Sequence, residues 1–200
     1  GFIPKLVREG FRGRIYGTAA TNEITRITLL DTARIQMEDA EFKRKRHERE
    51  GRKAPHPEIP LYTTDDAEAS FPYLSSVGYG DVVRLGDGVE ATFHDAGHVL
   101  GSAMIKVKVR QDNQERIIIF SGDIGRYGKP ILREPTLFDE ADYVLVESTY
   151  GERTLDPLEK SAGQLAEQIN LTAQKGGNII IPSFALERTQ EIIYYLNKLM

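Results

Sequence analysis

The 200-residue sequence contains no cysteine and only four histidines. Without cysteine there is no disulfide framework and no thiolate nucleophile or ligand, so any transition-metal site must use His, Asp and Glu. No apolar run approaches the roughly 18 residues that span a bilayer, and the first residues lack the pattern of a secretion signal. The sequence therefore predicts a protein without a disulfide scaffold or membrane-spanning helix, and a cytoplasmic location. The histidines are His47, His56, His94 and His98.

A strong charge of one sign is also missing, because 26 Lys and Arg stand against 30 Asp and Glu, for a formal net charge of −4. The apolar fraction of 40% fits an ordinary globular protein. At about 150 residues per domain, this length predicts one large domain, or one domain and the start of another. The chain opens at Gly1 and closes in an amphipathic stretch without a helix stop signal, so we expect a piece of a longer protein.

The first forty residues predict mostly helix. A short helix at 4–9 ends before Gly10, a brief strand follows at 14–16, and a long helix begins with Thr21 as a plausible N-cap. Spacings of three and four in that helix predict one apolar stripe facing the core. The stripe consists of Ile27, Leu30, Ala33, Met37 and Ala40.

A basic run follows at 42–53, with the sequence FKRKRHEREGRK, and the proline-rich segment 54–60 then breaks any helix. The pattern predicts a surface arm or loop. Two interpretations stay open for its charges: contact with a phosphate backbone, or a solvated helix end held by salt bridges.

In the second half, strand and helix patterns alternate. Residues 103–120 predict a β-hairpin with apolar side chains on one face and lysines on the other, exposed to water. Buried strands are predicted at 143–146 and 178–181, separated by a helix at 157–175 that Gly176 and Gly177 stop. This alternation indicates an α/β fold.

Polar residues follow three of the predicted strands: His98, Asp123 and Glu147. Strand ends line the ligand crevice in open α/β sheets, so we expect these three to converge on one site, with Gly97, Gly101 and Gly122 allowing tight turns around it. An imidazole and a carboxylate suit a divalent metal such as Zn²⁺, but two ligands do not complete a site. The remaining ligands must come from outside this chain. The other nearby histidine, His94, is interpreted as a partly exposed side chain at a strand end.

Four motifs occur in order along the chain: HDAGHVLGSA at 94–103, SGDIGR at 121–126, ESTYG at 147–151 and PSFALERTQE at 182–191. With these motifs the sequence resembles the β-CASP group of metallo-β-lactamase-fold nucleases, which includes ribonuclease J and the mRNA 3′-end endonuclease. The family's H-x-H-x-D-H metal motif and its C-terminal histidine motifs are absent, although GFIPKL at 1–6 resembles the stretch that follows the H-x-H-x-D-H motif.

The resemblance implies a partial metallo-β-lactamase αββα sandwich at 1–160 and the start of an inserted β-CASP domain at 161–200. It also implies a hydrolase that cleaves RNA with two Zn²⁺ ions per active site. In that family pattern His98 is a metal ligand, Asp123 bridges the two ions, and Glu147 is a catalytic acidic residue that supports proton transfer. The 200 residues alone are then expected to be inactive and to bind zinc poorly.

Two other functions stay open: a small-molecule metallo-hydrolase of the same fold, and a non-catalytic β-CASP scaffold subunit of an RNA-processing complex. Self-association into a homo-oligomer is also left open.

Ser183 and Arg188 are predicted to bind substrate phosphate, because Ser183 is predicted to begin a helix whose free N–H groups form an anion site, with Arg188 one turn in. The alternative for Ser183 is a plain N-cap.

Overall fold

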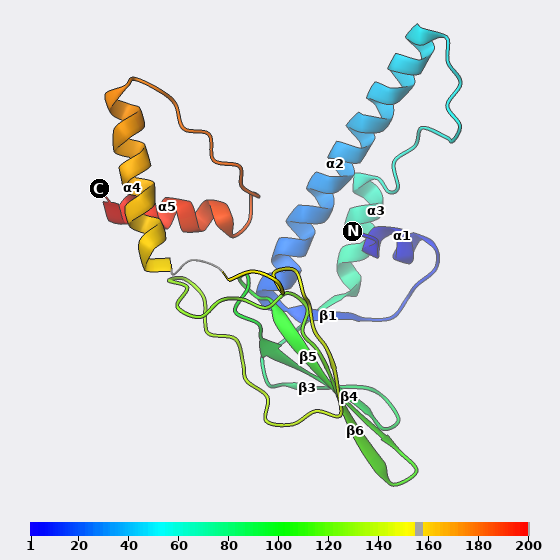
Figure 1. Ribbon diagram of the computed structural model, residues 1–200. Coiled ribbons are helices and arrows are strands. Elements are labelled where there is room, and N and C mark those ends of the chain that lie inside the picture. Colours follow the sequence, from blue (N-terminus) through cyan, green and yellow to red (C-terminus); the bar gives the residue numbers. More distant parts are fainter. Residues whose placement is uncertain (155–157, 200) are drawn as a thin grey trace. The chain divides into compact units, whose positions relative to one another are not determined.

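The computed structural model describes residues 1–154 and 158–199, and the chain divides into two compact units, 1–78 and 79–200 (Figure 1). The predicted domain boundary at residue 160 is a different division and stays a prediction. The elements in chain order are α1 (Ile3–Arg8), β1 (Ile15–Thr18), α2 (Ala19–Glu50), α3 (Thr64–Ser70), the 3₁₀ helix η1 (Phe71–Tyr73), β2 (Leu74–Val77), β3 (Val82–Gly86), β4 (Val89–Asp95), β5 (Ala103–Gln111), β6 (Gln114–Phe120), β7 (Tyr143–Leu145), α4 (Leu158–Gln174) and α5 (Arg188–Leu199).

In the first unit, β1 and β2 form a parallel pair, and α2 begins directly after β1. The N-cap is Thr18, whose hydroxyl accepts a hydrogen bond from the Thr21 N–H at 3.2 Å. The predicted cap at Thr21 was therefore wrong by three residues. Thr18 keeps extended backbone at the end of a strand, whereas Thr21 already lies in the first helical turn.

The core of this unit forms where Leu29 and Ala33 of α2 pack against Tyr62 and Ala67. The predicted stripe was right at Ala33 and at the half-buried Leu30, which packs against this core. It was wrong at Ile27 and Met37, which are 67% and 40% exposed. Neighbouring segments cover only a narrow line of α2, so most apolar residues of the stripe keep contact with water.

The basic run is helical up to Glu50, where α2 ends at Gly51 in left-handed backbone (φ 63°). The predicted arm or loop was therefore wrong for most of its length. Ion pairs between residues four apart support the helix, at 2.6 Å from Lys45 to Glu41 and 3.0 Å from Arg46 to Glu50. The run is therefore an exposed helix end that carries salt bridges, and contact with a phosphate backbone stays a prediction.

Asp66 ties α3 to α1 and caps its own helix. Its carboxylate accepts the Thr63 N–H and an Arg8 guanidinium N–H, both at 2.9 Å, and these bonds hold the pKa of Asp66 below its ordinary value.

Asp66→Ala should therefore lower the free energy of unfolding by about 1 kcal/mol at neutral pH. An aspartate whose pKa is lower in the folded than in the unfolded protein stabilises the fold fully only above its unfolded-state pKa of about 3.9. The difference in the free energy of unfolding between the two proteins should therefore vanish as pH falls through the native pKa of Asp66. Urea unfolding of both proteins at neutral and acid pH measures this, with exposed Asp65→Ala as the control; an equal loss at both pH values would contradict it.

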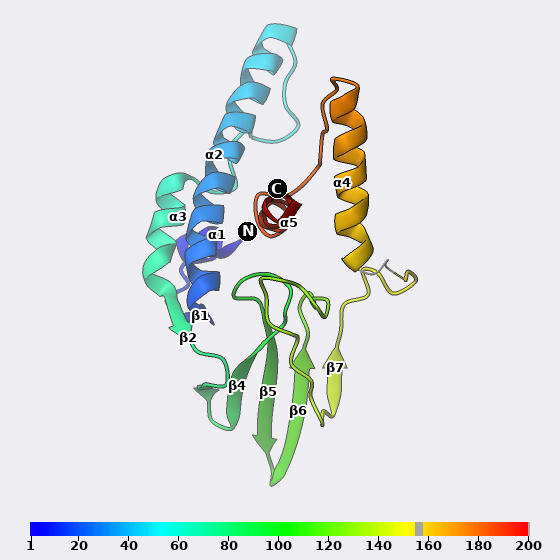
Figure 2. The same cartoon turned by 90° about the vertical axis from the view of Figure 1, so that its left-hand side faces the viewer.

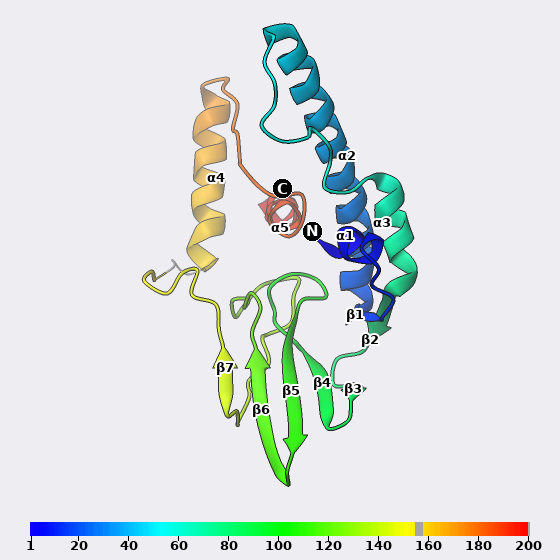
Figure 3. The same ribbon diagram turned by 90° about the vertical axis from the view of Figure 1, so that its right-hand side faces the viewer.

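In the second unit, five strands lie side by side in the order β3-β4-β5-β6-β7 (Figures 2 and 3). Neighbours are antiparallel except β6 and β7, which are parallel. The predicted hairpin at 103–120 is confirmed, with Asp112 and Asn113 at its turn in left-handed backbone (φ 50° and 60°). The α/β class is confirmed as well.

The prediction that the lysine-bearing face of the hairpin is exposed to water was wrong near the hairpin's open end. Met104 shares the face of Lys106, yet it is only 4% exposed. The loop between β6 and β7 lies over this end, where Phe138 makes an edge contact with the His94 ring and lines a cavity together with Met104 and Ile119.

Three further expectations concern the last sixty residues. The predicted strand at 143–146 forms as β7, but its side chains are exposed rather than buried, and β7 is an edge strand within the described part of the chain. The predicted strand at 178–181 was wrong: the segment is exposed and has no described partner to form a ladder. The helix before it is confirmed as α4, although the predicted start at Pro157 lies outside the described residues.

Across residues 1–154 and 158–199, no helix combines the length and the apolar character needed to cross a membrane.

Candidate active site

The structure brings His98, Asp123 and Glu147 to one cavity of about 580 Å³ in the second unit. The sheet topology explains why. Since β4 and β6 both run antiparallel to β5, and β7 runs parallel to β6, the carboxyl ends of β4, β6 and β7 meet at one edge. The predicted convergence of the three strand ends is therefore confirmed.

His98 and Asp123 face each other across the cavity, with 3.8 Å between Nε2 of the imidazole and Oδ2 of the carboxylate. Two ligands of one tetrahedral Zn²⁺ ion, at about 2.0–2.1 Å from the metal, lie about 3.4 Å apart. The pair thus fits part of a zinc site in both chemistry and spacing. Within residues 1–154 and 158–199, however, no group of three or more His, Asp or Glu side chains is arranged to hold a metal ion.

Glu147 is held by hydrogen bonds to both of its carboxylate oxygens. The Thr149 hydroxyl donates to one oxygen and the Ile124 N–H to the other, each at 2.6 Å. These hydrogen bonds lower the pKa of Glu147 below its ordinary value, and the bond from Thr149 has the larger effect. The side chain is therefore a carboxylate at neutral pH. Because Ile124 follows Asp123 directly, one loop positions both acidic residues.

Ser121 links the ends of β6 and β7, and sequence reasoning had not given it a role. The residue is only 3% exposed. Its hydroxyl donates to the Gly122 carbonyl and accepts the Glu147 N–H at 3.1 Å. The placement of Glu147 therefore depends on this buried hydroxyl as well as on the strand that precedes it.

Two backbone segments cross closely beside the site. The Gly125 N–H donates to the Ala96 carbonyl at 2.8 Å, and a Cβ atom built on Gly125 would lie 1.7 Å from the Gly97 oxygen. Gly97 itself has left-handed backbone (φ 62°). The predicted role of glycine in tight turns here is confirmed for Gly97, Gly101 and Gly122, while the close approach at Gly125 emerges only from the folded chain.

Lys129 and Glu187 form a second cluster on the cavity that sequence reasoning missed. The ammonium of Lys129 pairs with Glu187 and donates to the His98 carbonyl at 3.1 Å. The other Glu187 oxygen lies 3.9 Å from His98 Nε2. The predicted helix placed Glu187 within a regular turn, whereas the residue actually has left-handed backbone (φ 69°) just before α5; no local pattern marked this.

The expected helix start at Ser183 was wrong, because α5 begins at Arg188. Ser183 is exposed, lies within hydrogen-bond distance of the Thr189 hydroxyl (3.3 Å), and is not among the residues that line the cavity. Arg188 is the first residue of α5 and does line the cavity. The structure therefore brings Arg188, but not Ser183, to His98, Asp123 and Glu147.

The other histidines lie elsewhere. His94 is half-buried in β4, as predicted for a side chain near a strand end, and burial lowers its pKa. His47 pairs with Glu58 in the first unit, where His56 lines the same small cavity.

Comparison with known proteins finds relatives along almost the whole chain, although no family model matches. Ribonuclease TTHA0252 of Thermus thermophilus is 34% identical over 196 residues, covering 98% of this chain and 39% of that protein. Transcription termination factor FttA of Methanocaldococcus jannaschii is 30% identical, covering 99% and 29%. Endoribonuclease YSH1 of Eremothecium gossypii is 32% identical, covering 96% and 23%. The chain therefore spans less than half the length of each of these relatives.

Among solved structures, the crystal structure of BJP-1, a subclass B3 metallo-β-lactamase of Bradyrhizobium japonicum, is 19% identical with a TM-score of 0.24. The match covers 70% of this chain and 49% of that one.

Proposed function

Because this chain is a homologue of the β-CASP ribonucleases over nearly its whole length, we propose that it is part of a metal-dependent enzyme that hydrolyses phosphodiester bonds in RNA. The observation that carries the proposal is the convergence of His98, Asp123 and Glu147 on one cavity. In this proposal residues 1–160 belong to a metallo-β-lactamase domain and 161–200 begin a β-CASP domain. Endonuclease or exonuclease action and a cytoplasmic location belong to the same proposal.

His98 and Asp123 are the residues of this chain that would hold zinc, with Asp123 shared between two ions and the other ligands supplied by the rest of the protein. When bound, the metal would supply Lewis-acid stabilisation of the phosphate oxygens and a lowered pKa for the attacking water. The spacing of the two side chains supports this assignment.

Glu147 is a positioning and proton-transfer group in this proposal. Its carboxylate is oriented by the Ile124 N–H and the Thr149 hydroxyl, and it is ionised at neutral pH. A fixed carboxylate of this kind can support proton transfer to the leaving oxygen, here through a histidine from outside this chain. Arg188 supplies positive charge on the same cavity, and a guanidinium suits bidentate contact with phosphate.

The proposal is tested with the full-length protein and labelled single-stranded RNA. Cleavage should stop when a chelator removes the metal and return when Zn²⁺ is added, while hydrolysis of β-lactam or thioester substrates should be absent under both conditions. Turnover of those small substrates alone would favour the small-molecule hydrolase. Stoichiometric assembly with other RNA-processing proteins, without cleavage of any substrate, would favour the scaffold.

Arg188→Ala is expected to raise the KM for RNA several-fold, because it removes one phosphate contact from the cavity. The dependence of KM on salt should become shallower by about 0.7, the slope of a single contact to a single strand, with zinc content unchanged. KM measured over a salt series decides this, and Ser183→Ala, outside the cavity lining, is the matched comparison. An unchanged KM and slope in Arg188→Ala would return the residue to a structural role.

A further inference from the structure

One face of α2 near its C-terminal end combines an aromatic ring with three cationic side chains. Phe42, Lys45, Arg46 and Arg49 occupy positions i, i+3, i+4 and i+7, so they share one side of the helix, called here the α2 basic face. All four are exposed, and Phe42 is 63% exposed. An exposed phenylalanine among cations has no role in the core of this unit.

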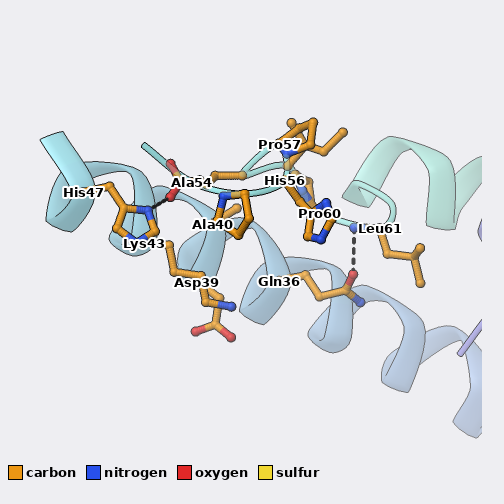
Figure 4. A pocket seen from close by; sticks show the side chains of 13 residues that line it. Gln36, Asp39, Ala40, Lys43, His47, Ala54, His56, Pro57, Pro60 and Leu61 are labelled. Atoms are coloured by element: carbon orange, nitrogen blue, oxygen red, sulfur yellow. Dashed lines mark hydrogen bonds and ion pairs between the residues drawn. The ribbon is translucent and has the colours of Figure 1, made fainter. Parts of the chain in front are cut away.

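The opposite side of α2 is already occupied by the chain that returns from Gly51. Figure 4 shows Gln36 and His47 joined to this proline-rich segment, and Lys43 lines the same cavity. The Leu61 N–H donates to the Gln36 side chain at 3.0 Å, and His47 pairs with Glu58. These contacts hold the returning segment along one side of the helix and leave the α2 basic face open within the first unit.

We propose that the α2 basic face binds single-stranded RNA, with phosphates on its cations and an unstacked base on the ring of Phe42. Charge carries the first half of this inference, since seven Lys and Arg stand against two Glu in residues 43–53 of a chain with a net charge of −4. The exposed ring carries the second half, because stacking on aromatic side chains is how proteins hold the bases of single strands.

The ion pairs that Lys45 and Arg46 make on the helix do not oppose this function. They join exposed side chains, and exposed pairs of this kind contribute little to stability. Phosphate oxygens can therefore replace Glu41 and Glu50 as partners at small cost, and counterion release from the RNA adds to binding. The inference rests on the proposed function only in its choice of RNA; it needs neither the cavity nor its metal.

Binding is measured on the full-length protein by fluorescence anisotropy with a short 2′-O-methyl oligonucleotide, which resists cleavage. The triple variant Lys45→Ala, Arg46→Ala, Arg49→Ala should bind roughly tenfold more weakly at about 100 mM salt, with a salt slope shallower by about 2. The control Arg14→Ala, Arg84→Ala, Lys175→Ala removes the same charge from exposed positions outside the basic run and should stay within about threefold of the original protein. Equal losses in the two triple variants would overturn the inference.

Phe42→Ala tests the stacking separately from the charge. We expect it to weaken binding about fivefold or more without changing the salt slope, and Phe42→Tyr to retain affinity. An abasic oligonucleotide of the same length should bind Phe42→Ala and the original protein equally. An equal loss with the abasic strand would contradict a stacking role.

Failure of the inference and failure of the proposed function give different results. If the protein cleaves RNA but the variants of the α2 basic face keep its RNA affinity, only the inference is wrong. If the protein does not cleave RNA but the triple variant and Phe42→Ala weaken RNA binding, only the proposed catalytic function is wrong. If Phe42→Ala instead separates a dimer and leaves RNA affinity unchanged, the face contacts a second copy, and the inference is wrong.

Discussion

Asp123→Ala in the full-length protein is expected to abolish bound zinc and RNA cleavage together. Asp123 faces His98 at 3.8 Å on the cavity, and in the proposed function it is shared by two metal ions, so its removal takes a ligand from both. The cleavage rate should fall by on the order of 10³ or more, since activation of water and stabilisation of the phosphate are lost at once. Metal analysis together with single-turnover cleavage measures both effects.

Glu147→Gln should separate the two effects. Glutamine keeps the shape and one acceptor oxygen for the Ile124 N–H, so the loop that carries Asp123 should stay in place and zinc content should not change. The rate should still fall by roughly 10²-fold or more, because the amide cannot support proton transfer.

Asp31→Ala, an exposed acid on α2, is the control for removal of a carboxylate and should leave both measurements unchanged. Loss of zinc in Glu147→Gln would show that Glu147 is a ligand and that the division of roles is wrong. Normal zinc content in Asp123→Ala would remove that residue from the metal site.

Gly125→Ala is expected to have the largest effect on stability. The added Cβ would lie 1.7 Å from the Gly97 oxygen and 2.6 Å from the His98 nitrogen, both backbone atoms, so no side-chain rotation relieves the overlap. We expect a loss of about 3 kcal/mol in the free energy of unfolding. Because the two crossing segments carry His98 and Asp123, zinc affinity should fall as well.

Gly163→Ala is the matched control. Gly163 lies inside α4 with no atom within 4 Å of a built Cβ, so alanine should stabilise the protein by up to about 1 kcal/mol through helix propensity. Urea unfolding followed by far-UV circular dichroism compares the two, since the chain has no tryptophan to report on unfolding. A Gly125→Ala protein as stable as the original would mean that the two segments separate without cost.

Local signals in the sequence predicted the parts of the site that depend on one strand and the turn after it. Polar residues after apolar runs located His98, Asp123 and Glu147, and the hairpin at 103–120 followed from alternation and the polar turn at 111–114. Convergence could be predicted because strand direction alone decides which ends share an edge. Neither step requires knowledge of what covers the sheet.

Helix ends and strand burial were predicted less well, because each depends on neighbours. The segment 178–181 has the composition of a buried strand, but no described strand pairs with it, and its backbone therefore forms no ladder. Helix α5 starts at Arg188 rather than at the predicted Ser183 for the same reason, because the strand expected to lead into that helix does not form.

The sequence by itself determined the α/β class, the hairpin, and the three polar residues at strand ends, since short-range patterning and the handful of possible strand connections are enough for these. Only the tertiary structure decided which side of α2 is buried, that Ser121 holds Glu147, and that Lys129 ties Glu187 to His98. Each of these depends on groups that approach from distant parts of the chain. A residue's own neighbours in sequence carry no information about such a partner, so the contact exists only once the chain has folded.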